Sequence, residues 1–380
     1  MRNVICSAAG MLFLVSVISA QGPKPDPIKD GRRLFETDTF GGNGRTCHTC
    51  HTAATGTVSP QDAAQRLKKN PADPLFIHDG SDDGQGNGVS RMLADATVLV
   101  TIPLPDNVTL ADDPTARTVT LRRGIASTLN TPALDKVLMV DGRQPTLADQ
   151  AAGAILDHAQ GVLPSPAELH NIGEFQKADA SFFSSSALRT FAHGGAPPSL
   201  PVGRTASEKR GRRFFEDVPP NPADGFTSGL CSHCHSGPLL NQTNQFAKDF
   251  IGLPIPAGER FFGVLVAELN AAHNPVREFV FNAGTPSESR VFSSDPGRSL
   301  ITGIANVPDP VANLTNVNAF KISPLRGVRL TAPYFHDNSA KTLDDVAAHY
   351  ANFFAIVTGG FINLTPQDQL DIVAYMQLLD

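Results

Sequence analysis

Cys-His-Thr-Cys-His at residues 47–51 recurs as Cys-Ser-His-Cys-His at residues 231–235, and the two stretches use four of the five cysteines of the chain. Cys-x-x-Cys-His is the attachment pattern of c-type haem. The two thiols bind one porphyrin covalently, and the adjacent imidazole coordinates its iron. The sequence therefore predicts two covalently bound haem groups. Haem 1 would be bound by Cys47 and Cys50 and haem 2 by Cys231 and Cys234, with His51 and His235 as iron ligands.

Other chemistries of paired cysteines are open at this point. A structural zinc ion takes four ligands in one cluster, so the two pairs would have to meet in space. That arrangement would leave His51 and His235 without a role. A thioredoxin-like redox motif requires a βαβ context, and neither stretch has one. A disulfide within each pair is the remaining alternative.

The first 20 residues have the pattern of a secretory signal peptide. An apolar run at 11–18 precedes Ser19-Ala20, after which we expect cleavage. Cleavage would also remove Cys6, so that haem would use every cysteine of the mature chain. An uncleaved anchor is the alternative, although the run is short for a membrane span of about 20 residues. The prediction is a soluble protein of the periplasm, which suits covalent haem attachment.

The length of the mature chain favours two domains, and its composition is that of a globular protein. The net charge of −6 disfavours a nucleic-acid partner. The chain has 32 glycines and 30 prolines, which indicate long irregular connections, and residues 194–201 form the clearest linker. We therefore predict a mainly α-helical protein with a few short strands, in which two cytochrome c-like haem domains follow in tandem over 21–195 and 196–380.

A weak internal repeat supports this division. Gly-Arg-Arg-x-Phe-Glu occurs at 31–36 and again at 211–216, ahead of each haem motif. We expect a duplicated unit in which a helix and a loop precede a haem motif that opens the next helix. Further helices are expected at 146–158, 166–175, 343–354 and 366–379, and short strands at 98–102 and 117–121.

Three stretches resemble the diheme bacterial cytochrome c peroxidase and MauG-like family. The most specific is 319–337, which contains Ala-Phe-Lys-Ile-Ser-Pro-Leu-Arg-Gly-Val and Leu-Thr-Ala-Pro-Tyr-Phe-His-Asp. Residues 231–239 and the Asp-Gly-Arg at 141–143 with the helix start after it are similar to further family signatures. The resemblance covers most of the mature chain. It implies that haem 1 reacts with hydrogen peroxide and that haem 2 transfers electrons.

The resemblance also implies a second ligand for the iron of haem 2. In the family this ligand lies 14 residues after the histidine of the Pro-Tyr-Phe-His stretch, and it is Met in the peroxidases and Tyr in MauG-like members. Fourteen residues after His336 is Tyr350. The adjacent His349 is the rival ligand, and a core tyrosine is the structural alternative.

Two positions depart from the family pattern. Val140 stands where the family has a tryptophan between the haems, and the chain has no tryptophan. Gln160 stands where a glutamate transfers the peroxide proton, and an amide cannot do this work. By the resemblance, Gln160 is the catalytic position, and His158 would substitute there for the missing carboxylate. Asp157 is another candidate substitute.

The distal ligand of haem 1 has more than one candidate in the sequence. His78 and His158 are the candidates for a sixth iron ligand, and a solvated or structural histidine is the alternative for both. Met139 and Met376 are lesser candidates. Calcium between the domains is expected from the resemblance, with backbone carbonyls of Thr331 and Pro333, although a full ligand set is not apparent.

The leading hypothesis is thus a periplasmic diheme oxidoreductase that reduces hydrogen peroxide. Its electron donor would be a small c-type cytochrome or another periplasmic protein. A diheme electron carrier or redox sensor without turnover is the alternative that the positions of Val140 and Gln160 favour. A MauG-like oxidation of a protein substrate is a third, which Tyr350 favours, and a homodimer is considered as the oligomeric state.

Overall fold

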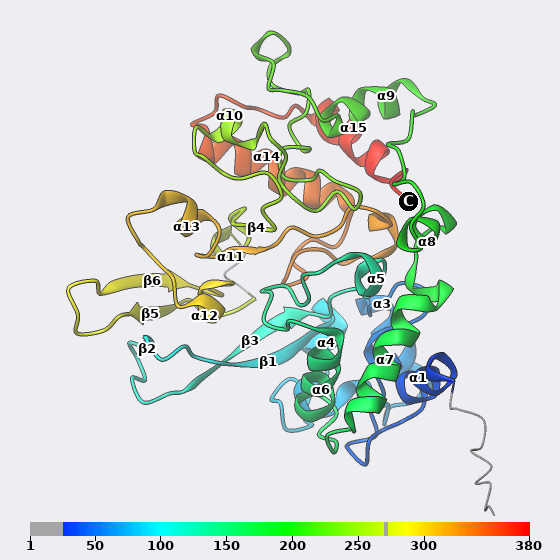
Figure 1. Cartoon of the computed structure of the whole chain (residues 1–380). Helices are drawn as coiled ribbons and strands as arrows, with labels where there is room; N and C mark the ends of the chain where they lie inside the picture. Colours follow the sequence, from blue (N-terminus) through cyan, green and yellow to red (C-terminus); the bar gives the residue numbers. More distant parts are fainter. Residues whose placement is uncertain (1–25, 270–272) are drawn as a thin grey trace, which may run out of the picture.

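The computed structural model describes residues 26–269 and 273–380 (Figure 1). The expected signal peptide at 1–20 lies outside this part of the chain. Helices predominate over short strands, as predicted. Among the described helices, none combines the length and the apolar composition that crossing a membrane requires.

The helices and strands have the following bounds. The helices are α1 (Pro27–Glu36), α2 (Cys47–Cys50), α3 (Pro60–Lys69), α4 (Ser90–Asp95), α5 (Thr131–Leu134), α6 (Leu147–Asp157), α7 (Pro166–Ala178), α8 (Ser186–Ala192), α9 (Ala206–Arg212), α10 (Ala247–Ile251), α11 (Val266–Leu269), α12 (Ser299–Thr302), α13 (Pro310–Leu314), α14 (Leu343–Val357) and α15 (Pro366–Met376). The strands are β1 (Thr97–Pro103), β2 (Val108–Leu110), β3 (Thr118–Gly124), β4 (Phe261–Phe262), β5 (Arg277–Phe281), β6 (Ser289–Ser293) and β7 (Phe320–Lys321).

The four helices predicted from the sequence, α6, α7, α14 and α15, are confirmed with small shifts at their ends. Each begins after a hydroxyl residue whose side chain accepts a hydrogen bond from the third residue of the helix. Such caps satisfy one of the free N–H groups at a helix start. Local sequence therefore defines where these helices begin. The caps are Thr146, Ser165, Thr342 and Thr365.

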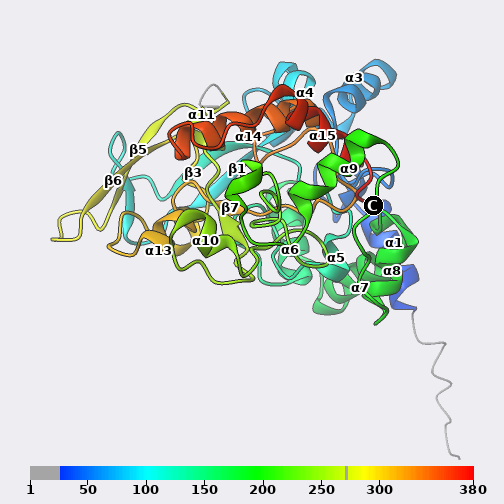
Figure 2. The same cartoon turned by 90° about the horizontal axis from the view of Figure 1, so that it is seen from above.

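The two predicted strands are also confirmed, as β1 and β3, which pair antiparallel. The sheet β2-β5-β6 was not predicted. Its strands β2 and β5 come from distant parts of the sequence, with Val108 opposite Phe281. No local sequence pattern therefore predicts their pairing. In Figures 1 and 2 this sheet projects at the end of the molecule away from α1 and α7.

The internal repeat has a structural counterpart in two close helix crossings. A side chain at Gly31 of α1 would lie 1.9 Å from the carbonyl oxygen of Asn171 on α7. A side chain at Gly211 of α9 would lie 1.9 Å from that of Asp371 on α15. Only glycine permits such an approach. The two Gly-Arg-Arg stretches therefore serve the same packing purpose in each half of the chain.

The repeat continues ahead of α6 and α14. Isolated antiparallel bridges join Leu138 to Gln144 and Tyr334 to Ala340. Each bridge ends two residues before the N-cap threonine of the following helix. The order of helix, haem motif, bridge and two helices thus occurs twice along the chain, and the division into domains at 195 and 196 stays a prediction.

One expectation about the repeat is wrong. The first haem motif forms the single turn α2, as expected, but residues 231–235 form turns and open no helix. Gly237, at φ +75°, and Pro238 follow directly. Both residues oppose helix continuation, since proline lacks the N–H that a helix requires and glycine adopts the left-handed backbone at little cost.

Candidate haem sites

The first haem motif lies in the wall of a cavity in the N-terminal half of the chain. Cys47, Cys50 and His51 all border this cavity. His51 Nδ1 donates a hydrogen bond of 2.8 Å to the carbonyl of Gly56, which leaves Nε2 free for a metal. Apolar side chains, among them Ile155, form much of the remaining wall.

The second haem motif repeats this arrangement in a separate cavity. Cys231, Cys234 and His235 border it. His235 Nδ1 donates to the carbonyl of Leu240 at 3.0 Å, five residues further on, just as Gly56 follows His51 by five. Burial lowers the pKa of His235 to about 4 and also lowers the pKa of His51. Both imidazoles are therefore neutral at pH 7, as metal ligation requires.

The described part of the chain does not favour the other uses of cysteine. No group of three or more His, Cys, Asp or Glu side chains gathers as a metal site in residues 26–269 and 273–380, so the two pairs do not form one zinc site. The four described cysteines are unpaired. Each cavity instead presents two thiols and one oriented imidazole beside apolar walls. This donor set fits haem c.

Helices α6 and α14 contribute to the two cavities in the same register. Five residues after the N-cap, Ala151 borders the first cavity and Ala347 the second. Eight residues after the N-cap, Ala154 borders the first cavity and Tyr350 the second. The repeat therefore places a phenol over one cavity and only a methyl group at the matching point of the other.

Tyr350, and not His349, faces the second cavity. The Tyr350 ring packs among the rings of Phe335, Phe353 and Phe354, at centroid distances between 6.2 and 6.4 Å. No hydrogen-bond partner of its hydroxyl is found in the described residues, and burial raises its pKa above the ordinary value. His349 Nε2 bonds to the carbonyl of Val264 at 2.8 Å, and this histidine is not part of the cavity lining.

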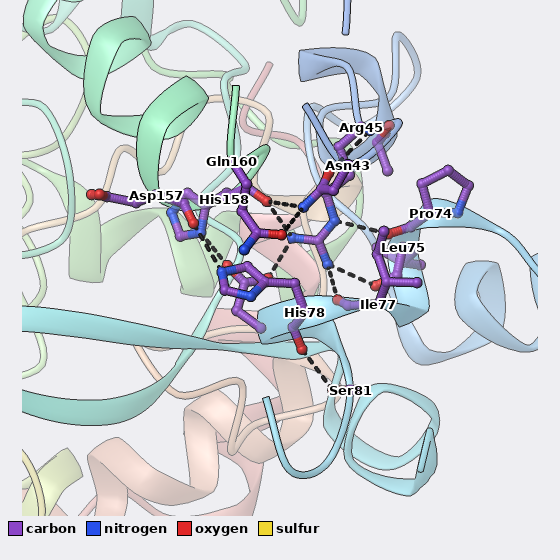
Figure 3. Close-up of polar contacts among 12 residues, drawn as sticks. Asn43, Arg45, Pro74, Leu75, Ile77, His78, Ser81, Asp157, His158 and Gln160 are labelled. Atoms are coloured by element: carbon purple, nitrogen blue, oxygen red, sulfur yellow. Dashed lines mark hydrogen bonds and ion pairs between the residues drawn. The ribbon is translucent and has the colours of Figure 1, made fainter. Parts of the chain in front are cut away.

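A buried polar cluster borders the first cavity. Arg45, which is 2% exposed, pairs with Asp79 and also donates to backbone carbonyls of the 74–77 turn (Figure 3). Asp79 accepts a second hydrogen bond, of 2.5 Å, from Nδ1 of His158. The tautomer that makes this bond carries its lone pair on Nε2, and His158 lies in the cavity lining. The cluster therefore holds a basic nitrogen at the wall of the haem 1 cavity.

The sequence pointed to His158 but not to its partners. Asp79 and His158 are 79 residues apart, and no spacing rule connects them. Burial by itself would raise the pKa of Asp79, but the hydrogen bonds and charges of His158 and Arg45 outweigh burial, and the pKa is lowered. Asp79 is therefore an anion at neutral pH.

Two of the other residues predicted near haem 1, Gln160 and His78, lie outside the lining of the first cavity. Gln160 is exposed, and its Oε1 accepts a hydrogen bond of 3.1 Å from Asn43 (Figure 3). His78 Nε2 bonds to the carbonyl of Asp157 at 3.0 Å. Of the two methionines, Met139 borders the first cavity, whereas Met376 borders the second. The roles assigned to these residues stay predictions.

The two cavities share a wall. Seven residues line both, namely Gly124, Ile125, Ala126, Ser127, Thr131, Val140 and Lys321. None of them is aromatic, so Val140 indeed stands between the two sites without a tryptophan or a substitute ring. The cofactors would be neighbours across a thin layer of aliphatic and backbone atoms. A calcium site built on carbonyls of Thr331 and Pro333 stays a prediction.

Comparison with known proteins gives matches among solved structures only. No protein-family model matches the chain. No curated protein sequence matches it at a significant level. Diheme peroxidases are among the structures that match.

Three matched structures cover most of the chain. A MauG-like protein associated with microbial copper homeostasis is 16% identical, with 93% of this chain and 89% of that chain covered and a TM-score of 0.49. The diheme peroxidase BthA from Burkholderia thailandensis is 16% identical, with 94% and 86% covered and a TM-score of 0.44. Hydrazine synthase from Kuenenia stuttgartiensis is 14% identical, with 99% of both chains covered and a TM-score of 0.35. The function proposed below is argued from the residues of this chain.

Replacing Asp79 should destabilise the protein. In the Asp79→Asn variant, Arg45 loses its buried counter-charge, and we expect the free energy of unfolding to fall by about 3–5 kcal/mol. Denaturant titration at pH 7 measures this difference. Because the folded pKa of Asp79 is lowered, its contribution is complete above about pH 4 and is lost as the pH falls through the folded pKa. The difference between wild type and variant should therefore shrink below pH 4, and a difference that is the same at all pH values would contradict this account.

Proposed function

We propose that this chain is a diheme c-type oxidoreductase of the cytochrome c peroxidase and MauG type, which reduces hydrogen peroxide at haem 1 and receives electrons through haem 2. The observation that carries the proposal is the shared register of α6 and α14. Tyr350 borders the second cavity, whereas the residue at the matching position of the first cavity is Ala154. One site is thus built for electron transfer and the other for a small ligand.

His158 is the residue that would transfer protons at haem 1. When bound, haem supplies a redox-active iron that binds peroxide. His158 Nε2 would accept a proton from one oxygen of a peroxide molecule in the cavity and donate it to the other oxygen, which leaves as water. Asp79 stabilises the imidazolium formed in between, and Arg45 keeps Asp79 ionised and in place. Two electrons and two protons convert each peroxide to two water molecules.

Electrons would cross the shared wall by tunnelling. Val140 and Lys321 lie in this wall, where Lys321 N donates to the carbonyl of Val140 at 2.7 Å. The three tyrosines of the chain are at 334, 350 and 375, so none lies in the wall as a stepping stone. This arrangement favours direct transfer between adjacent haems over radical hopping through a side chain.

We propose two cytochrome c-like domains over 21–195 and 196–380, export to the periplasm after removal of residues 1–20, and a small c-type cytochrome as electron donor. The negative charge of the chain suits a basic donor. Oxidation of a protein substrate and a homodimer are compatible with the same site.

Tyr350→Phe should alter haem 2 alone. Loss of the phenolate ligand would change the ferric absorption and EPR signals of haem 2 and raise its midpoint potential, because an anionic ligand stabilises ferric iron. His349→Ala is the matched control and should leave both unchanged, since His349 bonds to Val264 outside the cavity lining. The reverse pattern in a redox titration would assign the ligand to His349.

Absorption and low-temperature EPR of the ferric protein, before and after one equivalent of peroxide, test the function. We expect a high-spin signal that disappears on addition of peroxide. Two low-spin signals that do not change with peroxide, even after half-reduction, would favour the electron carrier or redox sensor. One observation favours the electron carrier or redox sensor. His158 borders the first cavity and uses Nδ1 for Asp79, so its Nε2 could coordinate the iron of haem 1 as a sixth ligand.

A further inference from the structure

Lys321 occupies the wall between the two cavities. It belongs to the short strand β7, and its backbone N–H bonds to Val140 of the other half of the chain. Its side chain is 9% exposed and borders both cavities. A primary ammonium at such a place requires a partner, because an uncompensated buried charge is costly.

The partner within the protein is shared with another cation. Asp135, whose side chain is fully buried, accepts from Lys321 Nζ at 3.3 Å and from Arg260 at 2.8 Å. The amide of Asn241 and the backbone N–H of Val137 also donate to this carboxylate. One negative charge therefore faces two positive charges, and the four donors, Lys321 included, occupy the lone-pair positions of the carboxylate.

The ammonium has one more donor than the described residues use. Lys321 Nζ donates to Asp135 and to the carbonyl of Val137 at 3.1 Å, and no third acceptor lies within reach in residues 26–269 and 273–380. The neighbouring cluster has no excess charge to offer, since Arg123 and Arg143 are balanced by Asp141 and Asp295. An anion on the cavity side would complete both the charge and the hydrogen bonding of Lys321.

We propose that Lys321 binds a haem propionate at the wall between the two haem sites, so that one ammonium sets the charge environment of both cofactors. The inference rests on the proposed diheme function, because the propionate is the anion that haem brings into these cavities. It deepens that function by naming the residue that would interact with the carboxylates of the cofactors. A cation beside a propionate stabilises the reduced haem, which carries one more electron, and so raises its midpoint potential.

The test compares Lys321→Met with wild-type holoprotein and with Arg290→Met, a control that removes an exposed cation of β6. We expect shifted propionate bending bands in the resonance Raman spectrum and a lower midpoint potential for at least one haem in Lys321→Met. Arg290→Met should match wild type in both. Bands and potentials of Lys321→Met equal to those of the control would overturn the inference.

Two further measurements separate the possible failures. Haem content by the pyridine haemochromogen assay comes first, and a wild-type chain without two haems would refute the proposed function itself. If Lys321→Met does not fold, Lys321→Arg replaces it. The guanidinium keeps the charge but changes the donor, so we expect shifted propionate bands at a nearly unchanged potential, and unshifted bands would again overturn the inference.

Discussion

The Cys47→Ala/Cys50→Ala double variant is expected to carry one haem in place of two. Each cavity contains its own thiol pair and its own proximal imidazole, and no protein ligand is shared between them. Loss of one pair should therefore remove one covalent attachment and leave the spectrum of the other haem. The pyridine haemochromogen assay and the mass of the denatured protein measure the number of attached haems.

The matched variants make this result decisive. Cys231→Ala/Cys234→Ala should lose the other haem, with the complementary half of the spectrum retained. Cys6→Ala should keep both haems, because Cys6 lies in the expected signal peptide. Two attached haems in either double variant, or zinc in the wild-type protein in place of iron, would refute the diheme assignment.

His158→Ala should slow the reaction with peroxide by about 10²–10⁴-fold, the usual contribution of general acid–base catalysis. The reason is the position of this imidazole, which borders the haem 1 cavity while Asp79 holds its Nδ1. Stopped-flow absorption of the Soret band under excess peroxide gives the second-order rate constant.

His78→Ala and Gln160→Leu are the controls for this variant. His78 bonds to a backbone carbonyl and Gln160 to Asn43, both outside the cavity lining, so we expect rate constants within a few-fold of wild type. A faster reaction of His158→Ala, together with a new high-spin EPR signal, would show that His158 is an iron ligand and not the base. An equal loss of rate in Gln160→Leu would return the catalytic role to the amide.

Local signals explain what could be predicted of the fold. Short stretches of sequence predict the haem motifs, the four capped helices and the strands β1 and β3. Helix caps and strand alternation depend on residues only a few positions apart. The sheet β2-β5-β6 was missed because its pairing joins residues such as Val108 and Phe281. The expected helix start at 231–235 is a turn, because Gly237 and Pro238 follow the motif and both oppose continuation of a helix.

The sequence by itself determined which cofactor we predict for this protein, and the tertiary structure decided which side chains border the cavities that would hold it. Two Cys-x-x-Cys-His stretches predict two haems because both thiols and the imidazole must serve one macrocycle. Which neighbour faces a cavity, Tyr350 or His349, depends on how α14 is rotated against the core. That His158 is held by Asp79, and that Lys321 lies between two cavities, depends on contacts between segments far apart in the chain. Such contacts form only on packing, so no local pattern can encode them.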